Sequence, residues 1–144
     1  MRIREILNAK GSEVSTVRAD LTIGALAQRL RDAQVGAMVV TGEAGGIEGI
    51  VTERDVVYAL AEHGGSVASR RVALIMSTGV VTCTPEATVS DVARTMTHKR
   101  IRHMPVTQNG ELVGIVSIGD ILKNRLDEVE LEANVLRDVA IAAR

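Results

Sequence analysis

Aromatic side chains are almost absent from this sequence: Tyr58 is the only one among 144 residues. The core must therefore be built from aliphatic side chains, and a site that stacks nucleic-acid bases on aromatic rings is disfavoured. Cys83 is the only cysteine, so an intrachain disulfide and a cysteine-based zinc site are both excluded. The three histidines are scattered without the spacing of metal ligands, and we expect no bound metal.

Neither the charge nor the hydropathy of the chain indicates a nucleic acid or a membrane as partner. The net charge is -1 and the isoelectric point is about 6.3, which gives no general attraction to nucleic acid. No apolar run approaches the roughly 18 residues of a membrane span, and the first residues lack the apolar run of a signal peptide. We therefore expect a soluble, cytoplasmic protein that binds neither.

One stretch of the sequence occurs twice. Gly49–Val57 reads GIVTERDVV and recurs 65 residues later as Gly114–Leu122, which reads GIVSIGDIL. The apolar run Met38–Thr41 recurs 66 residues later as Met104–Thr107. An internal duplication of this size predicts two copies of one supersecondary unit, packed on each other with approximate two-fold symmetry.

Each copy shows the same order of strand, helix, strand, strand and helix, which predicts a mixed α/β fold. The apolar spacing and turn residues predict strands at 14–17, 37–41, 47–51, 80–83, 102–107 and 112–116, and helices that begin near 22, 52, 88 and 117. We expect an N-terminal segment and first repeat at 1–66, a second repeat at 67–127 and an amphipathic C-terminal helix at 128–144. A short helix over Arg2–Asn8 is expected outside the duplication. The C-terminal helix is expected to pack on the body or on a second subunit, because it is too short to fold alone.

The repeated motif places a hydroxyl and a carboxylate at the start of a helix, Thr52 with Asp55 and Ser117 with Asp120. A helix N-terminus presents free N–H groups and a positive dipole end, which suit phosphate. The carboxylate can accept from both hydroxyls of a ribose, and the Thr or Ser hydroxyl can bond a phosphate or ribose oxygen. The alternative is a structural capping box, in which both side chains satisfy helix N–H groups. Residues 88–91 (TVSD) have the same spacing, and we expect them to form only a cap.

These features resemble a tandem pair of CBS domains, the Bateman module. The resemblance covers about residues 10–126 and rests on Gly49–Asp55, Gly114–Asp120 and Arg100–Val106. It implies a stand-alone, non-catalytic regulatory protein that binds adenosine-containing ligands in clefts between its repeats. AMP is the first expectation; ATP, ADP, NAD(H) and S-adenosylmethionine are further candidates, and no metal is required. Family members commonly pair into disc-like dimers, so the resemblance implies a homodimer that signals to an unknown regulated protein.

The resemblance also implies where the adenine lies, which is against the opening of the middle strand of each copy. That opening comprises Val35, Gly36, Ala37 and Met38 in the first copy, and Ile101, Arg102, His103, Met104 and Pro105 in the second. Thr16 and Thr82 stand at matched positions on the first strands, where family members often reach ligand. The alternative is that Val35, Met38, Ile101 and Met104 are ordinary core residues, and we expect at least one of each pair to be so.

The two copies differ in charge. Residues 99–103 read KRIRH and place four basic or potentially basic groups beside the second site, where they would steady a phosphate chain; a solvated surface is the alternative. Lys10 and Arg54 are further phosphate candidates, and Gly119 stands where a counterpart of Arg54 would be. We therefore expect two non-equivalent sites, for example with a mononucleotide in one and a dinucleotide in the other.

Two other functions compete with a nucleotide sensor. An enzyme would use Cys83 with His98 or His103, but a cysteine in an apolar strand is more commonly structural, and we expect no catalysis. A protein-interaction module without a ligand would retain the same capping boxes, so the sequence leaves this alternative open. Asp120→Asn separates the cases: it should keep the fold and remove most nucleotide affinity if the ribose contact exists.

Overall fold

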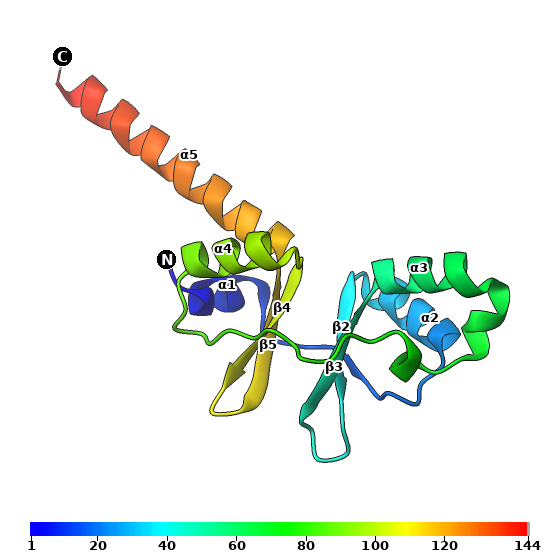
Figure 1. The fold of residues 1–144 in the computed structure, drawn as a ribbon. Coiled ribbons are helices and arrows are strands. Elements are labelled where there is room, and N and C mark those ends of the chain that lie inside the picture. The colour runs from blue at the N-terminus through cyan, green and yellow to red at the C-terminus, as the bar shows by residue number, and fades with distance from the viewer. Residues whose placement is uncertain (144) are drawn as a thin grey trace.

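A computed structural model describes residues 1–143 and contains two α/β units side by side. The β2–β3 hairpin of one unit and the β4–β5 hairpin of the other lie next to each other in the middle of the molecule (Figure 1). Helices α2 and α3 cover the outer side of the first hairpin, and α1 and α4 cover the outer side of the second. The predicted mixed α/β fold with two pseudo-symmetric repeats is confirmed.

The first unit contains β1 (Thr16–Val17), α2 (Ile23–Ala33), β2 (Ala37–Thr41), β3 (Ile47–Thr52) and α3 (Glu53–His63). Strand β1 pairs in parallel with β2, and β2 pairs antiparallel with β3. This arrangement brings the end of β3, where the repeated motif lies, beside the start of β2.

The second unit contains α4 (Val89–Lys99), β4 (His103–Gln108), β5 (Glu111–Ser117) and α5 (Ile118–Ala142). The antiparallel β4–β5 pair matches β2–β3 and joins His103 to Ser117 at its open end. The predicted strand at 80–83 is wrong in its extent, because in the described chain it is reduced to a single parallel bridge between Cys83 and Val106.

The first helix of each unit begins and ends in the same way. The Oγ1 atoms of Thr22 and Thr88 accept hydrogen bonds from backbone N–H groups three residues later, at 3.2 and 3.1 Å. Gln34 and Arg100 follow the two helices in the same left-handed conformation, with φ 54° and ψ 43°. This turn reverses the chain into β2 and β4, so matched local sequence produces matched geometry.

Each unit has its own aliphatic core, as the near-absence of aromatic residues predicts. The core of the first unit comprises Val17, Leu26, Leu30, Met38, Val40, Val51 and Val72. The core of the second comprises Ile3, Ile6, Leu7, Val89, Val92, Met96, Met104, Val106, Val116 and Ile121. The burial of these side chains against both faces of short sheets is the main stabilising contribution to the fold.

The N-terminal helix α1 (Ile3–Lys10) packs on the second unit rather than on the first, which follows it in the chain. Ile3 N donates to Ala87 O at 2.9 Å, and Val89 N donates to Met1 O at 2.9 Å. The segment before the second repeat makes the same bonds to the first unit: Val72 N donates to Leu21 O and Ile23 N to Arg70 O, both at 2.8 Å. The expectation that the N-terminal helix lies outside the duplication is therefore wrong, since the two units exchange equivalent leading segments.

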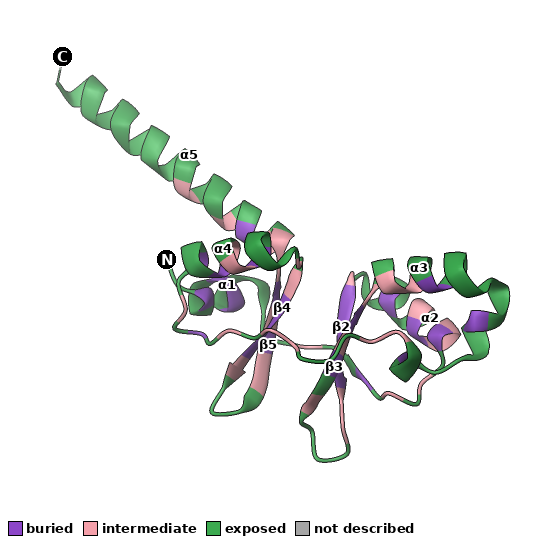
Figure 2. Cartoon of the chain, in the orientation of Figure 1, coloured by how far each residue is buried: buried purple, intermediate pink, exposed green. Residues whose placement is uncertain are grey.

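Helix α5 is a single continuous helix of 25 residues that extends the second unit and projects away from the body (Figure 1). Its first turns contact the core through Ile121, whereas the distal part is exposed over its whole circumference (Figure 2). The predicted amphipathic C-terminal helix is thus the continuation of the helix that begins after Ser117. None of the helices among residues 1–143 combines the length and apolar character that a membrane crossing requires.

Candidate nucleotide site

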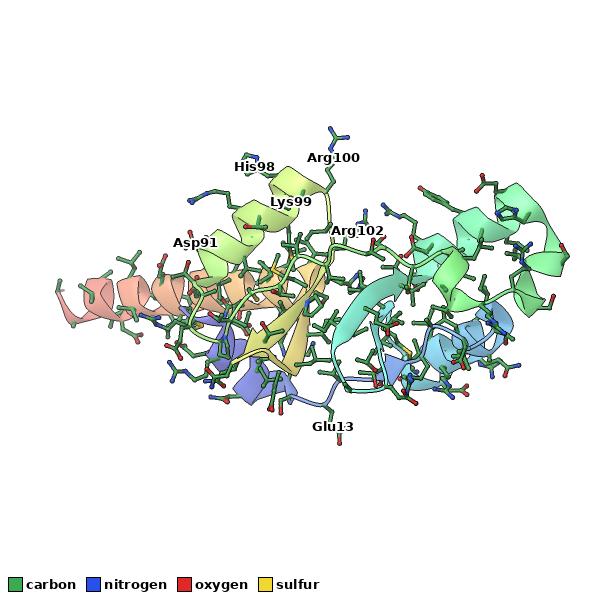
Figure 3. The ribbon with its side chains drawn as sticks, turned by 60° about the horizontal axis from the view of Figure 1, so that its bottom comes forward. Glu13, Asp91, His98, Lys99, Arg100 and Arg102 are labelled. Atoms are coloured by element: carbon green, nitrogen blue, oxygen red, sulfur yellow. The ribbon has the colours of Figure 1, made fainter. Side chains whose placement is uncertain are left out.

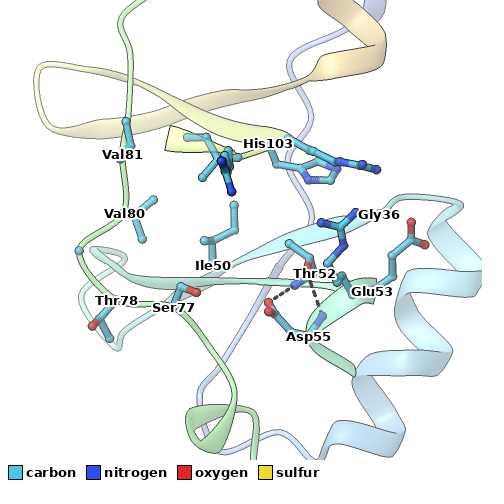
Figure 4. A pocket seen from close by; sticks show the side chains of 15 residues that line it. Gly36, Ile50, Thr52, Glu53, Asp55, Ser77, Thr78, Val80, Val81 and His103 are labelled. Carbon is cyan, nitrogen blue, oxygen red and sulfur yellow. Dashed lines mark hydrogen bonds between the residues drawn. The ribbon is translucent and has the colours of Figure 1, made fainter. Parts of the chain in front are cut away.

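A cavity of 390 Å³ lies between the two units (Figure 4). The first unit contributes the start of α3, and the second contributes the turn before β4; the strand-like connection at 77–81 closes one side. The lining residues are Gly36, Ile50, Thr52, Glu53, Arg54, Asp55, Ser77, Thr78, Gly79, Val80, Val81, Arg100, Ile101, Arg102 and His103. A pocket of this volume falls in the range of small-molecule and cofactor sites.

The first copy of the repeated motif forms a complete capping box at this cavity. Thr52 N donates to Asp55 Oδ2 at 2.8 Å, and Asp55 N donates to Thr52 Oγ1 at 3.2 Å (Figure 4). The structural interpretation and the ligand-binding interpretation of the motif are therefore compatible. One carboxylate oxygen of Asp55 is used by the cap, and among the described residues no cation forms an ion pair with this carboxylate.

The second copy forms the same capping box but carries an additional cation. Ser117 N donates to Asp120 Oδ2 at 2.8 Å and Asp120 N to Ser117 Oγ at 3.1 Å. Lys10 Nζ lies 2.7 Å from the same Asp120 Oδ2 and also donates to Ile115 O at 2.9 Å. Burial alone would raise the pKa of Asp120, but the bonds from Lys10 and Ser117 outweigh it and hold the pKa below its ordinary value.

Lys10 reaches Asp120 because the N-terminal leading segment is longer than its counterpart. The matched residues Arg2 and Arg71 stand 69 positions apart, whereas Thr16 and Thr82 stand 66 apart. The three extra residues extend α1 to Lys10, at the end of the helix. The side chain of Lys10 is 34% exposed and that of Asp120 is 22% exposed, so the pair is partly shielded from water.

Residues 88–91, which share the spacing of the motif, form a cap of a simpler kind. Asp91 N donates to Thr88 Oγ1 at 3.1 Å. The Asp91 carboxylate instead faces Arg94, with 3.4 Å between Oδ1 and the guanidinium. Asp91 projects from α4 at the surface (Figure 3) and does not line the cavity. Its position agrees with the expectation that this motif is only a cap.

The basic run at 99–103 contacts both copies of the motif. Its backbone borders the second copy, since Arg102 O accepts from Ile118 N at 2.8 Å, and its residues from Arg100 to His103 line the cavity that contains Asp55. Figure 3 shows His98, Lys99 and Arg100 projecting away from the body at the end of α4, with Arg102 closer to the middle. Arg102 and His103 are thus the basic residues of this run nearest to the space between the units.

His103 of the second unit touches Gly36 of the first. A Cβ atom added at Gly36 would lie 3.2 Å from His103 Nε2, so the close approach depends on the glycine. Burial lowers the pKa of His103; the nearby carboxylates of Glu53 and Asp120 oppose this shift, and Lys10 and Arg102 add to it. The imidazole is therefore mainly neutral at pH 7, and it can both donate and accept a hydrogen bond at the cavity.

The remaining predicted residues divide between core and surface. Ala37, Met38, Met104 and Pro105 are buried in the two cores, whereas Val35 is exposed and Ile101 lines the cavity. One residue of each Val35/Met38 and Ile101/Met104 pair is therefore core, as expected. Thr16 on β1 and Thr82 in the connection before α4 are both exposed and do not line this cavity.

The sequence alone did not indicate the connection at 77–81 as part of the site. Ser77 exchanges backbone hydrogen bonds with Ile50 at 2.9 and 3.0 Å, which draws this connection across β3 and beside the cavity. The available signal was the run of small and polar residues Ser77-Thr78-Gly79 before the second repeat. Its contact with β3 depends on long-range pairing, which local patterns do not specify.

Cys83 and the histidines give no indication of catalytic or metal chemistry in the described part of the chain. Burial raises the pKa of the Cys83 thiol to about 11, so its nucleophilic thiolate form is scarce at neutral pH. No group of three or more His, Cys, Asp or Glu side chains among residues 1–143 is arranged to hold a metal ion.

The fold and the site together define a duplicated α/β module with a cavity of 390 Å³ between its repeats. The sequence matches the CBS domain family over residues 3–62 and 71–127, and the chain belongs to this family. The mitochondrial CBS domain-containing protein CBSX3 of Arabidopsis thaliana is 33% identical over 129 residues, which cover 84% of this chain and 63% of the relative. The chain therefore spans a little under two thirds of that protein.

Solved structures of CBS-domain proteins have the same fold as this chain. The CBS-domain protein ATU1752 from Agrobacterium tumefaciens is 41% identical, with a TM-score of 0.84 over 86% of this chain and 92% of that one. The CBS domain pair of protein MJ0100, in complex with 5′-methylthioadenosine and S-adenosyl-L-methionine, is 25% identical, with a TM-score of 0.80 over 89% and 98%. A hexameric CBS-CP12 protein from bloom-forming cyanobacteria is 30% identical, with a TM-score of 0.76 over 99% and 87%.

Proposed function

We propose that this CBS domain pair is a non-catalytic sensor that binds an adenine nucleotide in the cavity between its repeats and reports its occupancy to a partner protein. The observation that carries the proposal is the composition of the cavity. It joins Thr52 and Asp55 of the first copy to Arg102 and His103 of the second. A ligand that contacts both would link the two units, and the bound adenosine derivatives of MJ0100 support the ligand class.

Each part of a nucleotide has a suitable group in the cavity. The free oxygen of the Asp55 carboxylate can accept from the ribose hydroxyls, while its other oxygen keeps the cap. The N-terminus of α3 together with Arg54 and Arg102 suits phosphate. Aliphatic side chains of the lining, such as Val80 and Ile101, can enclose the adenine in place of aromatic rings.

The arginines favour an anionic ligand over the sulfonium cation S-adenosylmethionine. The lining includes three arginines, Arg54, Arg100 and Arg102, and two acidic residues, Glu53 and Asp55, so phosphate charge improves the electrostatic balance. We therefore rank AMP, ADP, ATP and NAD(H) above S-adenosylmethionine.

The second copy would form a weaker site. Ser117 and Asp120 present the same groups, but Lys10 already occupies the Asp120 carboxylate at 2.7 Å. Lys10 and the cap share the Oδ2 atom of Asp120, so a ribose would bond to the other carboxylate oxygen, whose negative charge the ammonium group already offsets. The sites would therefore be non-equivalent, as the sequence predicts, and the leading segment is the cause.

Signalling requires that the nucleotide binds two arrangements of the protein with different affinity. Because the cavity is shared by both units, occupancy would favour one relative orientation of the repeats, which a homodimer or a regulated protein could recognise.

The proposal is tested with a thermal-shift panel of AMP, ADP, ATP, NAD+, NADH, S-adenosylmethionine and GTP, followed by calorimetric titration of the strongest ligand. A ligand at 100 times its Kd adds about 2.7 kcal/mol to the free energy of unfolding. We expect a shift with adenine ligands and none with GTP. Titration is repeated with Asp55→Asn, and Asp91→Asn is the control because it changes an aspartate at the matching position in the first turn of α4, remote from the cavity.

A shift that Asp55→Asn abolishes and Asp91→Asn leaves intact supports the proposed site. No shift with any nucleotide, from protein free of co-purified ligand, would instead support the ligand-free interaction module. Equal losses in the two variants would show that the effect is not specific to the cavity.

A further inference from the structure

One face of α5 carries a regular apolar stripe that is largely exposed and packs on no core among residues 1–143. Its members are Leu122, Leu126, Val129, Ala133, Leu136 and Ala140, and we name this set the α5 seam. The spacing alternates between four and three residues, which keeps the side chains on one side of an α-helix. Leu126, Val129 and Leu136 are 63%, 61% and 70% exposed, a costly arrangement for a stripe of this length.

The α5 seam is not the side of the helix that faces the body. The body contacts a different side, where Ile121 is buried in the core and Asn124 Nδ2 lies 2.8 Å from Met1 Sδ. Arg125 also points to the body and donates to Ser90 Oγ at 2.9 Å. Further along, the helix leaves the body entirely (Figure 1). The seam is therefore accessible along its full length.

The charges beside the α5 seam specify a partner. Glu132 precedes the seam residue Ala133 on one flank, and Arg137 follows Leu136 on the other. In a parallel, in-register pair of identical helices these are the positions that face each other across the interface, so Glu132 of each copy meets Arg137 of the other. Among the described residues, neither side chain forms an ion pair within the chain.

The antiparallel arrangement with full overlap of the seam is disfavoured by the same charges. It places Glu132 opposite its own copy and Lys123 opposite Arg137, which are like-charge contacts. The second parallel contact would join Arg125 to Glu130, although Arg125 is already bonded to Glu128 and Ser90 in its own chain. The distal Glu132–Arg137 contact, made twice by symmetry, therefore sets the orientation.

We propose that the α5 seam pairs with the α5 seam of a second copy of this chain in a parallel two-stranded coiled coil. The interface lies outside the nucleotide cavity and is independent of whether a nucleotide binds. It would hold the two CBS pairs at the same end of the coiled coil.

Disulfide trapping in the full chain tests the geometry. Ala133 lies on the axis of the proposed pair, so Ala133→Cys should give a covalent dimer under mild oxidation, because matched positions on the axis are close enough for a disulfide. Leu131→Cys is the matched control, since Leu131 is also exposed but lies on the opposite side of α5. Wild-type protein, whose only cysteine is Cys83, is the control for disulfides formed by that residue. Trapping of Ala133→Cys alone supports the proposal; equal trapping of both variants, or of neither, overturns it.

Charge exchange tests the orientation independently of the packing. In the Ala133→Cys background, Glu132→Arg should weaken dimer formation about tenfold, because two attractive contacts become repulsive. Adding Arg137→Glu should restore it, since the pairs are re-formed with reversed sign. Sedimentation equilibrium and the trapping rate give the measurement. If the double variant dimerises as weakly as Glu132→Arg alone, the parallel arrangement is contradicted.

Discussion

The two copies of the repeated motif have the same backbone geometry and different neighbours. Asp55 and Asp120 each accept from the N–H of the capping residue at 2.8 Å. Only Asp120 also receives an ammonium group, from Lys10 at 2.7 Å. The difference arises far from either motif, in a leading segment that is three residues longer before the first repeat than before the second. A duplicated site can thus diverge through a change in connection length, while its capping hydroxyl and carboxylate are retained.

The largest expected effect is the contrast between the two carboxylates in nucleotide binding. Asp55→Asn should weaken binding about 10- to 100-fold, because it removes a charge-assisted acceptor for the ribose. Asp120→Asn should change the main affinity less than about threefold, because that carboxylate is already paired with Lys10. Calorimetric titration measures both. Equal losses in the two variants would contradict the asymmetry, and both caps should persist because the Asn oxygen can still accept from the backbone.

The next effect concerns Lys10. Lys10→Met keeps the aliphatic length and removes the ammonium group, so Asp120 is released and the second copy should bind nucleotide about tenfold more tightly. Total binding measured by equilibrium dialysis at high ligand concentration reports the gain. If the affinity of the second copy falls instead, Lys10 is a phosphate ligand, as its position in the sequence also allows, and does not block the site.

A smaller effect is expected from His103 and pH. Its pKa is lowered mainly by burial, so it gains a proton only below its ordinary value of about 6.5. A bound phosphate would favour the imidazolium form, and affinity should therefore rise as the pH falls through the lowered pKa. The affinity is measured by titration between pH 5 and pH 7.5 for the wild type and for His103→Gln. The difference between the two profiles excludes the contribution from protonation of the ligand itself. His98→Gln is the control, and an identical pH profile in wild type and His103→Gln would contradict the contact.

The smallest effect concerns stability in acid. The pKa of Asp120 is lowered from 3.8 in the folded protein, so its contribution is fully present above that value and is lost as the pH falls through the lowered pKa. We expect Lys10→Met to reduce the free energy of unfolding by about 0.5–1 kcal/mol at pH 6. Urea unfolding should show this difference shrinking below pH 3.8. A difference that stays constant to pH 3 would show that packing, rather than the ion pair, is responsible.

The features that the sequence predicted correctly depend on local order along the chain. The capping boxes at Thr52 and Ser117, the hairpins and the matched helices each involve residues a few positions apart, where spacing and turn chemistry determine geometry. The duplication in the sequence also predicted that the two units pack on each other. These local signals also placed Asp55 at the boundary where the cavity forms.

The features that the sequence missed depend on contacts between distant segments. Lys10 and Asp120 are separated by 110 positions, and no periodicity links them. The exchange of leading segments and the contact of Ser77 with Ile50 are likewise long-range backbone pairings. The connection at 80–83 consists of residues that are common in strands, but within residues 1–143 only Cys83 pairs with another strand. Local propensity cannot state how many partners a strand will have.

The most direct test of the difference between the two copies is the number of nucleotides bound per chain at a concentration near ten times the tighter Kd. Isothermal titration of wild type and Lys10→Met with the strongest adenine ligand gives this number. We predict one nucleotide per chain in the wild type, about half of one or less in Asp55→Asn, and two in Lys10→Met. Two equal sites in the wild type, or one site that Asp55→Asn leaves intact, would contradict the assignment of the first cleft as the open site.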